Sequence, residues 1–474
     1  MSARFPEAFV WGVSTSAYQI EGGVDVDGRG PSIWDTFSAI PGKVIGGDDG
    51  RIAADHRHRM TEDVALLAEL GVDAYRFSIA WPRVQPDGRR AASGGGLDFY
   101  RALVDALLAA GVEPVVTLYH WDLPQALEDA GGWPARDTAS RFADYARVVA
   151  EALGDRVARW TTINEPWCVA MLGYGAGVHA PGRTDAAAAV VASHHVLLAH
   201  GLGTEVLRAT VHGRAEIAIA LNPYPVVVAG DRDEDRDAAR RVDGVANRLW
   251  YDAVLLGRYP DDVLDDFTRV ADLAHIRDGD LAIIGAPIDA LGINYYRRHH
   301  VRFAPAASAA PPDSAWPGSP DIELVQPPGP TTDGGWAIEP DGLREVLEHV
   351  ATAYAPPPLF VHESGCVFDD EPGPTGEVLD TDRIRYLRGH FAAARAAMDG
   401  GVDLRGFFVW SFLDNFEWAE GYAHRFGIVH VDFDSLERTP KASARWYAEV
   451  VARNSIDQGA LDRAPRGAYP RSRA

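Results

Sequence analysis

Short apolar segments alternate with longer segments of helical periodicity along most of the chain. Eight of the apolar segments are near-continuous hydrophobic runs, typical of strands buried on both faces of a parallel sheet. They cover residues 8–13, 74–81, 114–121, 160–165, 216–222, 290–296, 359–363 and 406–412. Of the helical segments, 61–71 is expected to begin with a Thr61 cap and end at Gly71, and 97–111 is expected to end at Gly111. The alternation predicts an α/β fold, a single (β/α)8 TIM barrel with elaborated loops at its C-terminal face.

Two segments fall outside this alternation. Residues 304–335 are rich in Pro, Ala and Gly and have no periodicity, which is compatible with a flexible linker. Because predicted strands continue on both sides of them, we favour an inserted loop over the strand C-termini that borders a binding site. Residues 455–474 are expected to be a flexible tail. The whole chain, 1–474, is therefore predicted to be one domain.

The charge balance limits the possible partners. With 68 acidic and 45 basic side chains the formal net charge is −23, which disfavours nucleic acid and anionic membranes and favours a small-molecule ligand. Cys168 and Cys366 have neither metal-ligand nor redox-pair spacing. We see no basic region followed by a long apolar stretch and no run of about 18 apolar residues. A cytoplasmic location is expected, and the oligomeric state is not indicated.

Polar and aromatic side chains gather where the predicted strands end. Barrel enzymes carry their reactive groups at these C-terminal ends, whereas a purely structural barrel does not need them there. The residues concerned are Arg76, Trp81, His120, Trp121, Asp122, Asn164, Glu165, Asn294, Tyr295, Tyr296, Glu363 and Trp410.

Two carboxylates stand out in this set. Glu165 and Glu363 each end an apolar run, and the fourth and seventh strands are expected to face each other across the barrel. A single Glu at such a place is more often a structural salt-bridge partner. A pair over one barrel mouth suits glycoside hydrolysis, in which one carboxyl protonates the leaving oxygen and the other attacks or activates water.

Long motifs add a family resemblance. The stretches FVWGVSTSAYQIEGG, YRFSIAWPR, LYHWDLPQAL, TINEP, INYY, WSFLDNFEW and GYAHRFGIVHVDF resemble, in the same order, the motifs of family 1 glycoside hydrolases. The resemblance covers residues 9–447. It implies a (β/α)8 barrel and a retaining β-glycosidase, most simply a β-glucosidase acting on a β-glucoside or short oligosaccharide without any cofactor or metal.

The resemblance also implies roles for individual residues. Glu165 matches the acid/base and Glu363 the nucleophile, which are expected to be about 5 to 5.5 Å apart in a retaining enzyme. The nucleophile would be supported by Arg76, Asn294 and Tyr296. The sugar would be bound by Gln19, His120, Trp121, Asn164, Trp410, Glu417 and Trp418. Trp167, Trp336 and Phe426 fall on the leaving-group side, although ordinary packing explains these three equally well.

Substrate choice is only partly indicated. The carboxylate of Glu417 would accept hydrogen bonds from two sugar hydroxyls and repel a 6-phosphate, and NFEWAEGYAHRFG lacks the Ser- and Lys-containing pattern of the family's phospho-sugar branch. Glucosides are thus favoured over 6-phosphoglucosides. Preference for galactosides or fucosides, and for transglycosylation, stays open.

One motif departs from the family. Where the family usually reads Thr-Glu-Asn-Gly around the nucleophile, this chain reads His362, Glu363, Ser364 and Gly365. We expect local repacking with activity intact, and the alternative is a weakened catalyst or a protein that mainly binds carbohydrate. A metal-dependent barrel hydrolase is a further alternative, but His120 and Asp122 are too few ligands at the strand ends, and His56 and His58 lack a third ligand.

Overall fold

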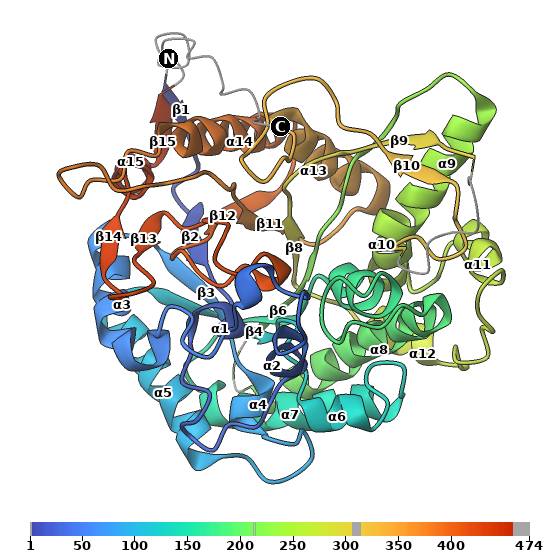
Figure 1. The fold of residues 1–474 in the computed structure, drawn as a ribbon, viewed down its shortest axis with the longest axis horizontal. Helices are drawn as coiled ribbons and strands as arrows, with labels where there is room; N and C mark the ends of the chain where they lie inside the picture. Colours follow the sequence, from blue (N-terminus) through green and yellow to red (C-terminus); the bar gives the residue numbers. More distant parts are fainter. Residues whose placement is uncertain (1, 212, 214, 306–313, 458–474) are drawn as a thin grey trace.

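The computed structural model describes residues 2–211, 213, 215–305 and 314–457. Its centre is a closed barrel of parallel strands, so the predicted (β/α)8 fold class is confirmed (Figure 1). In barrel order the strands are β2 (Val10–Ser14), β3 (Ala74–Ser78), β4 (Glu113–Tyr119), β5 (Arg159–Asn164), β6 (Glu216–Leu221), β8 (Ala290–Asn294), β11 (Leu359–Ser364) and β12 (Leu404–Trp410), which pairs with β2.

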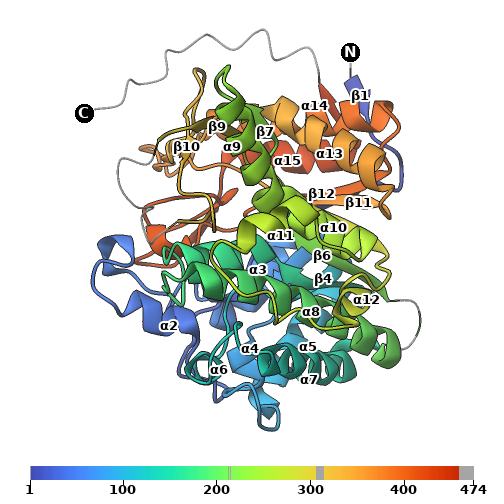
Figure 2. The same ribbon diagram turned by 90° about the vertical axis from the view of Figure 1, so that its right-hand side faces the viewer.

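At least one helix follows each barrel strand, and one helix after each strand contributes to the outer layer (Figures 1 and 2). These outer helices are α3 (His56–Leu70), α5 (Gly94–Ala109), α7 (Asp137–Leu153), α8 (Ala186–Thr210), α10 (Leu249–Leu256), α13 (Pro340–Tyr354), α14 (Thr381–Asp399) and α15 (Ala442–Arg453). By length and composition α8 could cross a membrane. It is 72% buried in its most apolar window and packs against α7 and η2 (Cys168–Gly175), as a core helix does.

The remaining elements lie in the connecting loops. Three small sheets join β1 (Ser2–Arg4) to β15 (Ser455–Asp457), β9 (His299–Phe303) to β7 (Val226–Val228) and β10 (Ile322–Leu324), and β13 (Val429–Val431) to β14 (Arg438–Pro440). The short helices are α1 (Ala17–Ile20), α2 (Ile33–Ser38), η1 (Ile45–Gly47), α4 (Trp81–Val84), α6 (Gln125–Asp129), α9 (Asp233–Asp243), η3 (Gly244–Arg248), α11 (Asp261–Phe267), α12 (Asp280–Ile284) and η4 (Trp418–Glu420).

Several expectations about element bounds, and one about the relative position of two strands, are wrong. Helix α3 begins at His56 rather than at Thr61, because Asp55 already takes the N-cap position. Strand β3 ends at Ser78, since Trp81 opens α4 and packs its fully buried ring on Tyr145 instead of lying at the barrel mouth. Strands β5 and β11 are separated by β6 and β8 only, so they are not directly opposite each other.

The described parts of the two irregular segments pair or pack with the rest of the fold. Within 304–335, residues 306–313 lie outside the described part, but β10 pairs with β9 and Trp316 packs 5.7 Å from Trp167, centroid to centroid. Within 455–474, β15 pairs its main chain with β1, which corrects the expected start of the tail, and 458–474 lie outside the described residues.

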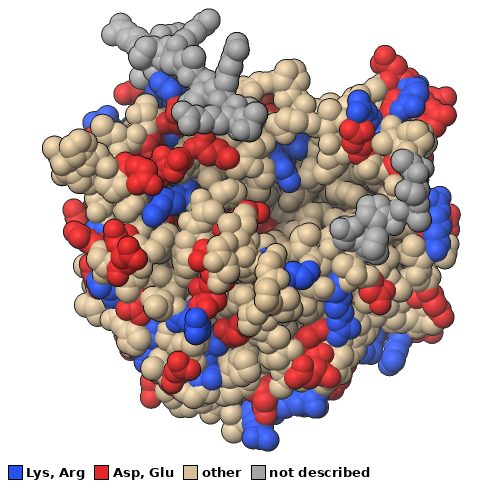
Figure 3. Space-filling model, viewed as in Figure 1, with Lys and Arg blue, Asp and Glu red and all other residues tan. Residues whose placement is uncertain are grey.

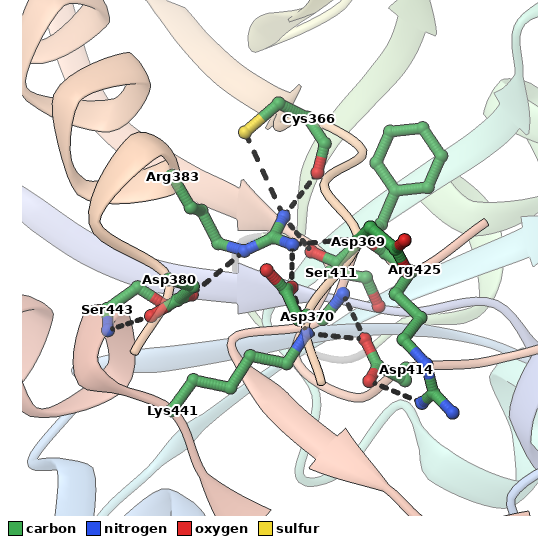
Figure 4. Close-up of polar contacts among 12 residues, drawn as sticks. Cys366, Asp369, Asp370, Asp380, Arg383, Ser411, Asp414, Arg425, Lys441 and Ser443 are labelled. Carbon is green, nitrogen blue, oxygen red and sulfur yellow. Dashed lines mark hydrogen bonds and ion pairs between the residues drawn. The ribbon is translucent and has the colours of Figure 1, made fainter. Parts of the chain in front are cut away.

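Acidic and basic side chains are interspersed over the face of the molecule shown in Figure 3, and a network of charged side chains connects the loops that follow β11 and β12 (Figure 4). Lys441 Nζ donates to Asp370 at 2.6 Å and to Asp414 at 2.8 Å, and Arg383 Nη1 donates to the carbonyl oxygen of Phe426 at 3.1 Å. Asp380 and Arg425 also belong to this network, because Asp380 pairs with Arg383 and Arg425 pairs with Asp414. Because Phe426 lies in the loop after β12 and lines the cavity at the barrel mouth, the network helps to hold that part of the cavity wall in place.

Replacing Lys441 with methionine is expected to destabilise the fold strongly. The Lys441 side chain is fully buried, so its loss leaves Asp370 and Asp414 with less compensating charge and is expected to lower the free energy of unfolding by about 3 to 5 kcal/mol. The matched control is Arg405→Met, which removes an exposed pair with Asp403 and is expected to cost at most about 1 kcal/mol. Thermal and denaturant unfolding measure both, and equal losses would contradict the buried network's role.

Candidate active site

A cavity of about 220 Å³ lies at the C-terminal ends of the barrel strands and brings together most of the predicted site residues. Glu165, Glu363, His120, Trp121, Trp167, Tyr296, Trp336, Trp410, Glu417, Trp418 and Phe426 line it. Arg76, Asn164, Asn294 and Gln19 do not line it and instead hydrogen-bond to the residues that do. The strand-end pattern therefore located one continuous site.

Three of the lining residues have a backbone conformation that is unfavourable for residues with side chains. Trp121, Glu165 and Trp418 have φ values of 76°, 47° and 53°. Such conformations cost about 1 to 3 kcal/mol each and persist only where surrounding contacts hold them. At Glu165 the main-chain N–H donates to the carbonyl oxygen of Ala220 on β6 at 2.9 Å. The fold thus holds strained residues at the point where side chains enter the cavity.

Glu363, at the end of β11, is held by a cation and a hydroxyl. Arg76 Nη1 on β3 donates to its Oε1 at 2.6 Å, and the Tyr296 hydroxyl donates to its Oε2 at 2.9 Å. Arg76 is completely buried and Glu363 nearly so. A buried guanidinium beside a carboxylate favours the ionised form of that carboxylate.

Glu165 has neutral partners only. Asn294 Nδ2 donates to its Oε1 at 2.7 Å, and the Cys168 thiol donates to its Oε2 at 3.0 Å. Asn164 links the two carboxylates, because its Oδ1 accepts from both Arg76 (2.6 Å) and Asn294 (3.1 Å). One hydrogen-bonded chain therefore runs from Glu363 to Glu165.

These partners separate the protonation states of the two carboxyls. Burial and then the negative charge of Glu363 raise the pKa of Glu165 to about 8. Burial raises the pKa of Glu363 as well, but Arg76 and the Tyr296 hydroxyl oppose that rise. When the two carboxyl groups carry one proton between them, that proton lies on Glu165 and Glu363 is ionised.

Hydrogen bonds also fix the orientation of the amide and imidazole groups beside the carboxylates. Arg76 can only donate, so the Asn164 atom facing it is Oδ1, and Nδ2 points to His120 Nε2 at 3.0 Å. His120 Nε2 must then accept. Burial and the charge of Arg76 lower the pKa of His120 well below its usual value, which keeps the ring neutral.

A second set of polar groups lies on the far side of the cavity. Gln19 Nε2 donates to Glu417 Oε2 at 3.0 Å and to Asn415 Oδ1 at 2.9 Å, while its Oε1 accepts from Ser16. Burial and the charge of Glu363 raise the pKa of Glu417 to about 8. Gln19 therefore fixes the orientation of the Glu417 carboxyl group beside the cavity.

Aromatic rings form the walls. Trp410 and Trp418 both pack near the His120 ring, at centroid distances of 5.7 and 6.0 Å, and Trp121 packs 4.7 Å from Trp418. Rings of this kind offer apolar faces to the C–H groups of a sugar. On the other side Trp336 packs between Tyr296 (5.6 Å) and Phe426 (6.0 Å).

Several cavity residues were not predicted from the sequence. They are Leu172, Tyr224, Arg297, Ala419 and Glu420, together with Cys168, whose sequence position was interpreted only in terms of metal-ligand and redox-pair spacing. Cys168 lies three residues after Glu165, and Tyr224 lies three residues after the end of β6. Both could therefore have been predicted as site residues from their closeness in sequence to a strand end. Arg297 was detectable only as the neighbour of Tyr296.

The two departures from the family motif lie in different surroundings. The His362 ring lies 6.1 Å from Phe360 and 5.7 Å from Phe408, and an added Cβ on Gly292 would be 2.2 Å from His362 Nδ1. Burial, followed by the charges of Arg76 and Arg159, lowers the pKa of His362 well below its usual value. His362 is thus a neutral packing residue below the site, and Ser364 Oγ lies 3.5 Å from the Tyr386 hydroxyl.

Within the described residues, no group of three or more His, Cys, Asp or Glu side chains could hold a metal ion. His56 contacts Asp63 and His58 contacts Asp55, in two separate pairs.

Comparison with known proteins decides the family. The sequence model of glycosyl hydrolase family 1 matches residues 1–456. The chain belongs to glycosyl hydrolase family 1. Among family 1 relatives it is 46% identical to a bifunctional β-D-glucosidase/β-D-fucosidase from Bifidobacterium breve (96% of this chain, 100% of the relative). It is 48% identical to the thermostable β-glucosidase B of Thermobispora bispora (96% and 92%).

Solved structures of family 1 enzymes have the same fold as this chain. The family 1 β-glucosidase from Thermotoga maritima superposes with a TM-score of 0.90 at 44% identity, over 96% of this chain and 99% of that one. A psychrophilic β-glucosidase from Micrococcus antarcticus gives a TM-score of 0.92 at 45% identity, over 95% and 98%. The Thermotoga maritima enzyme has also been solved with isofagomine lactam bound. The chain is therefore a glycoside hydrolase whose relatives are named β-glucosidases.

Proposed function

We propose that this family 1 enzyme is a retaining β-glucosidase, with Glu165 as acid/base and Glu363 as nucleophile. The observation that carries the proposal is the difference between the partners of two carboxyls in one cavity. Glu363 has a guanidinium and a hydroxyl, and Glu165 has an amide and a thiol. A nucleophile must be ionised and a general acid must be protonated, and these partners favour that assignment.

The first half-reaction uses both groups at once. The Glu363 carboxylate forms a bond to the anomeric carbon while the bond from that carbon to the aglycone oxygen breaks, and Glu165 gives its proton to the leaving oxygen. The product is a glycosyl ester on Glu363. Because this ester carries no charge, the electrostatic rise in the pKa of Glu165 is removed, and Glu165 becomes a base.

The second half-reaction reverses the roles. Glu165 takes a proton from water, the water oxygen bonds to the anomeric carbon, and the ester bond to Glu363 breaks. Two inversions at one carbon retain the β configuration. Gln19 and Glu417 would hold sugar hydroxyls during both steps, and Trp410 would provide the floor beneath the ring.

One assay tests this function. Aryl β-glucoside, β-galactoside and β-fucoside are compared side by side, and the anomer first released is followed by proton NMR. We expect the glucoside to be hydrolysed and β-glucose to appear before mutarotation. Initial release of the α anomer would contradict the retaining assignment, and hydrolysis of none of the three would favour the carbohydrate-binding alternative.

β-Fucosidase activity is the second candidate. The Bifidobacterium breve relative is named for both glucosidase and fucosidase activity. The Glu417 carboxylate could accept hydrogen bonds from hydroxyls of either sugar, so the same panel of substrates ranks the two activities.

The pH profile gives a further prediction. For an alkyl glucoside, whose leaving oxygen needs a proton, kcat/KM is expected to fall as pH rises through about 8, because Glu165 then loses the proton that it must donate. A dinitrophenyl glucoside leaves without that proton, so the same alkaline limb should largely disappear. Glu417 has a pKa raised to the same region, and an identical limb with both substrates would assign the titration to Glu417 instead.

A further inference from the structure

Cys168 occupies an unusual place beside the acid/base. It opens η2, directly after the turn that carries Glu165, and its side chain lines the catalytic cavity while remaining 5% exposed. Its Sγ lies 3.0 Å from Glu165 Oε2, and Asn222 Nδ2 lies 3.4 Å from Sγ on the other side. The thiol is therefore held between an amide donor and a carboxylate acceptor.

The two oxygens of Glu165 are not equivalent. Oε1 accepts from Asn294 Nδ2, which can only donate, so a proton on that oxygen would face another donor. The proton of the general acid consequently belongs on Oε2, the oxygen that Cys168 contacts. When Oε2 is protonated, the thiol has no anionic acceptor. When Oε2 is ionised, the thiol makes a charge-assisted hydrogen bond to it.

The thiol can act as this donor because it stays protonated. Burial, with the charges of Glu165 and Glu363, raises the pKa of Cys168 well above its usual value. A thiolate would add a third negative charge to the cavity and could not donate. Cys366, the other cysteine, lies outside the cavity lining and near Arg383, so it offers a matched comparison.

We propose that Cys168 is a positioning residue for the acid/base: its thiol holds Glu165 Oε2 in place and stabilises the ionised carboxylate that activates water in the second half-reaction. This inference rests on the role proposed for Glu165. No bond to sulfur forms or breaks, and the thiol keeps its proton throughout the cycle. Its contribution is greatest when Glu165 is ionised, that is, in the glycosyl-enzyme.

Two substitutions with opposite expected effects test the proposal. Cys168→Ser places a stronger donor at the same position, whereas Cys168→Ala removes the donor. In profiles of kcat/KM for an alkyl glucoside, serine is expected to move the alkaline limb to lower pH and alanine to move it to higher pH, each by about half a unit to one unit. Cys366→Ala is expected to leave the limb where the wild-type enzyme has it.

The rate of the second half-reaction supplies an independent readout. With a dinitrophenyl glucoside, whose ready departure is expected to make the second half-reaction rate-limiting, Cys168→Ala is expected to lower kcat more than kcat/KM. Circular dichroism checks that each variant is folded, and serine rescue of kcat separates hydrogen bonding from packing. An unchanged alkaline limb in both Cys168 variants, or shifts of the same sign, would overturn the proposal.

A test on Glu165→Ala distinguishes an error in the role of Cys168 from an error in the proposed function. If azide rescues Glu165→Ala but the Cys168 variants keep the wild-type pH profile, only the role of Cys168 is wrong. If azide does not rescue Glu165→Ala, the acid/base assignment itself fails, and the inference about Cys168 fails with it.

Discussion

Replacing Glu363 with glutamine is expected to lower kcat/KM for aryl β-glucosides by about 10⁴- to 10⁶-fold, the scale on which an essential nucleophile is lost. Glutamine has nearly the same shape and can still accept a hydrogen bond from Arg76, but its neutral amide does not form the glycosyl ester. Initial rates and unfolding curves of the purified variant measure the effect, and the fold is expected to be unchanged.

A neighbouring glutamate gives the control for this substitution. Glu420 lines the same cavity but makes no ion pair with Arg76, so Glu420→Gln removes a negative charge there without removing the proposed nucleophile. We expect it to cost far less activity than Glu363→Gln. Wild-type-like rates in Glu363→Gln, or equal losses in both variants, would remove the nucleophile assignment.

Removing the acid/base is expected to have the second-largest effect, and one that depends on the leaving group. Without the Glu165 proton donor, hydrolysis of alkyl glucosides should fall by about 10² to 10⁴-fold, while glycosylation by a dinitrophenyl glucoside should fall much less. Added azide needs no general base, so it should restore turnover of the dinitrophenyl substrate in Glu165→Ala and yield β-glucosyl azide.

The stereochemistry of that azide product is informative in itself. The β anomer is the product of attack on an α-linked glycosyl ester of Glu363. Absence of rescue would count against Glu165 as the acid/base, and an α-glucosyl azide would count against double displacement. Asn294→Ala is a useful comparison, because it removes a donor to Glu165 Oε1 but leaves the proton donor itself.

The barrel was predictable because its strands are buried on both faces. Each strand then reads as a continuous apolar run, and all of the predicted runs overlap strands of the closed barrel. The bounds were less predictable where local preference and packing disagree. Apolar residues after Ser78 extend the run that forms β3, but Trp81 begins a short helix because its ring packs against Tyr145.

The candidate active site was predictable from the sequence only in part. Glu165 and Glu363 could be found because polar residues at the end of a buried strand are conspicuous, and Arg76 because it is a charged residue within an otherwise apolar strand. Which oxygen each group contacts depends on geometry between strands distant in sequence, such as the bridge that Asn164 makes between Arg76 and Asn294. The sequence spacing of Cys168 indicates neither a metal site nor a redox pair, and spacing of this kind does not predict a hydrogen bond from the thiol to a carboxylate.

The measurement that tests the central claim most directly is mass spectrometry of Glu165→Ala during turnover of a dinitrophenyl glucoside. The second half-reaction is slow in this variant, so the glycosyl-enzyme should accumulate and survive acid quenching. We predict that the protein becomes heavier by one glucosyl unit and that peptide mapping places the unit on Glu363. Attachment to another residue, or no covalent adduct while product is still released, would contradict the account.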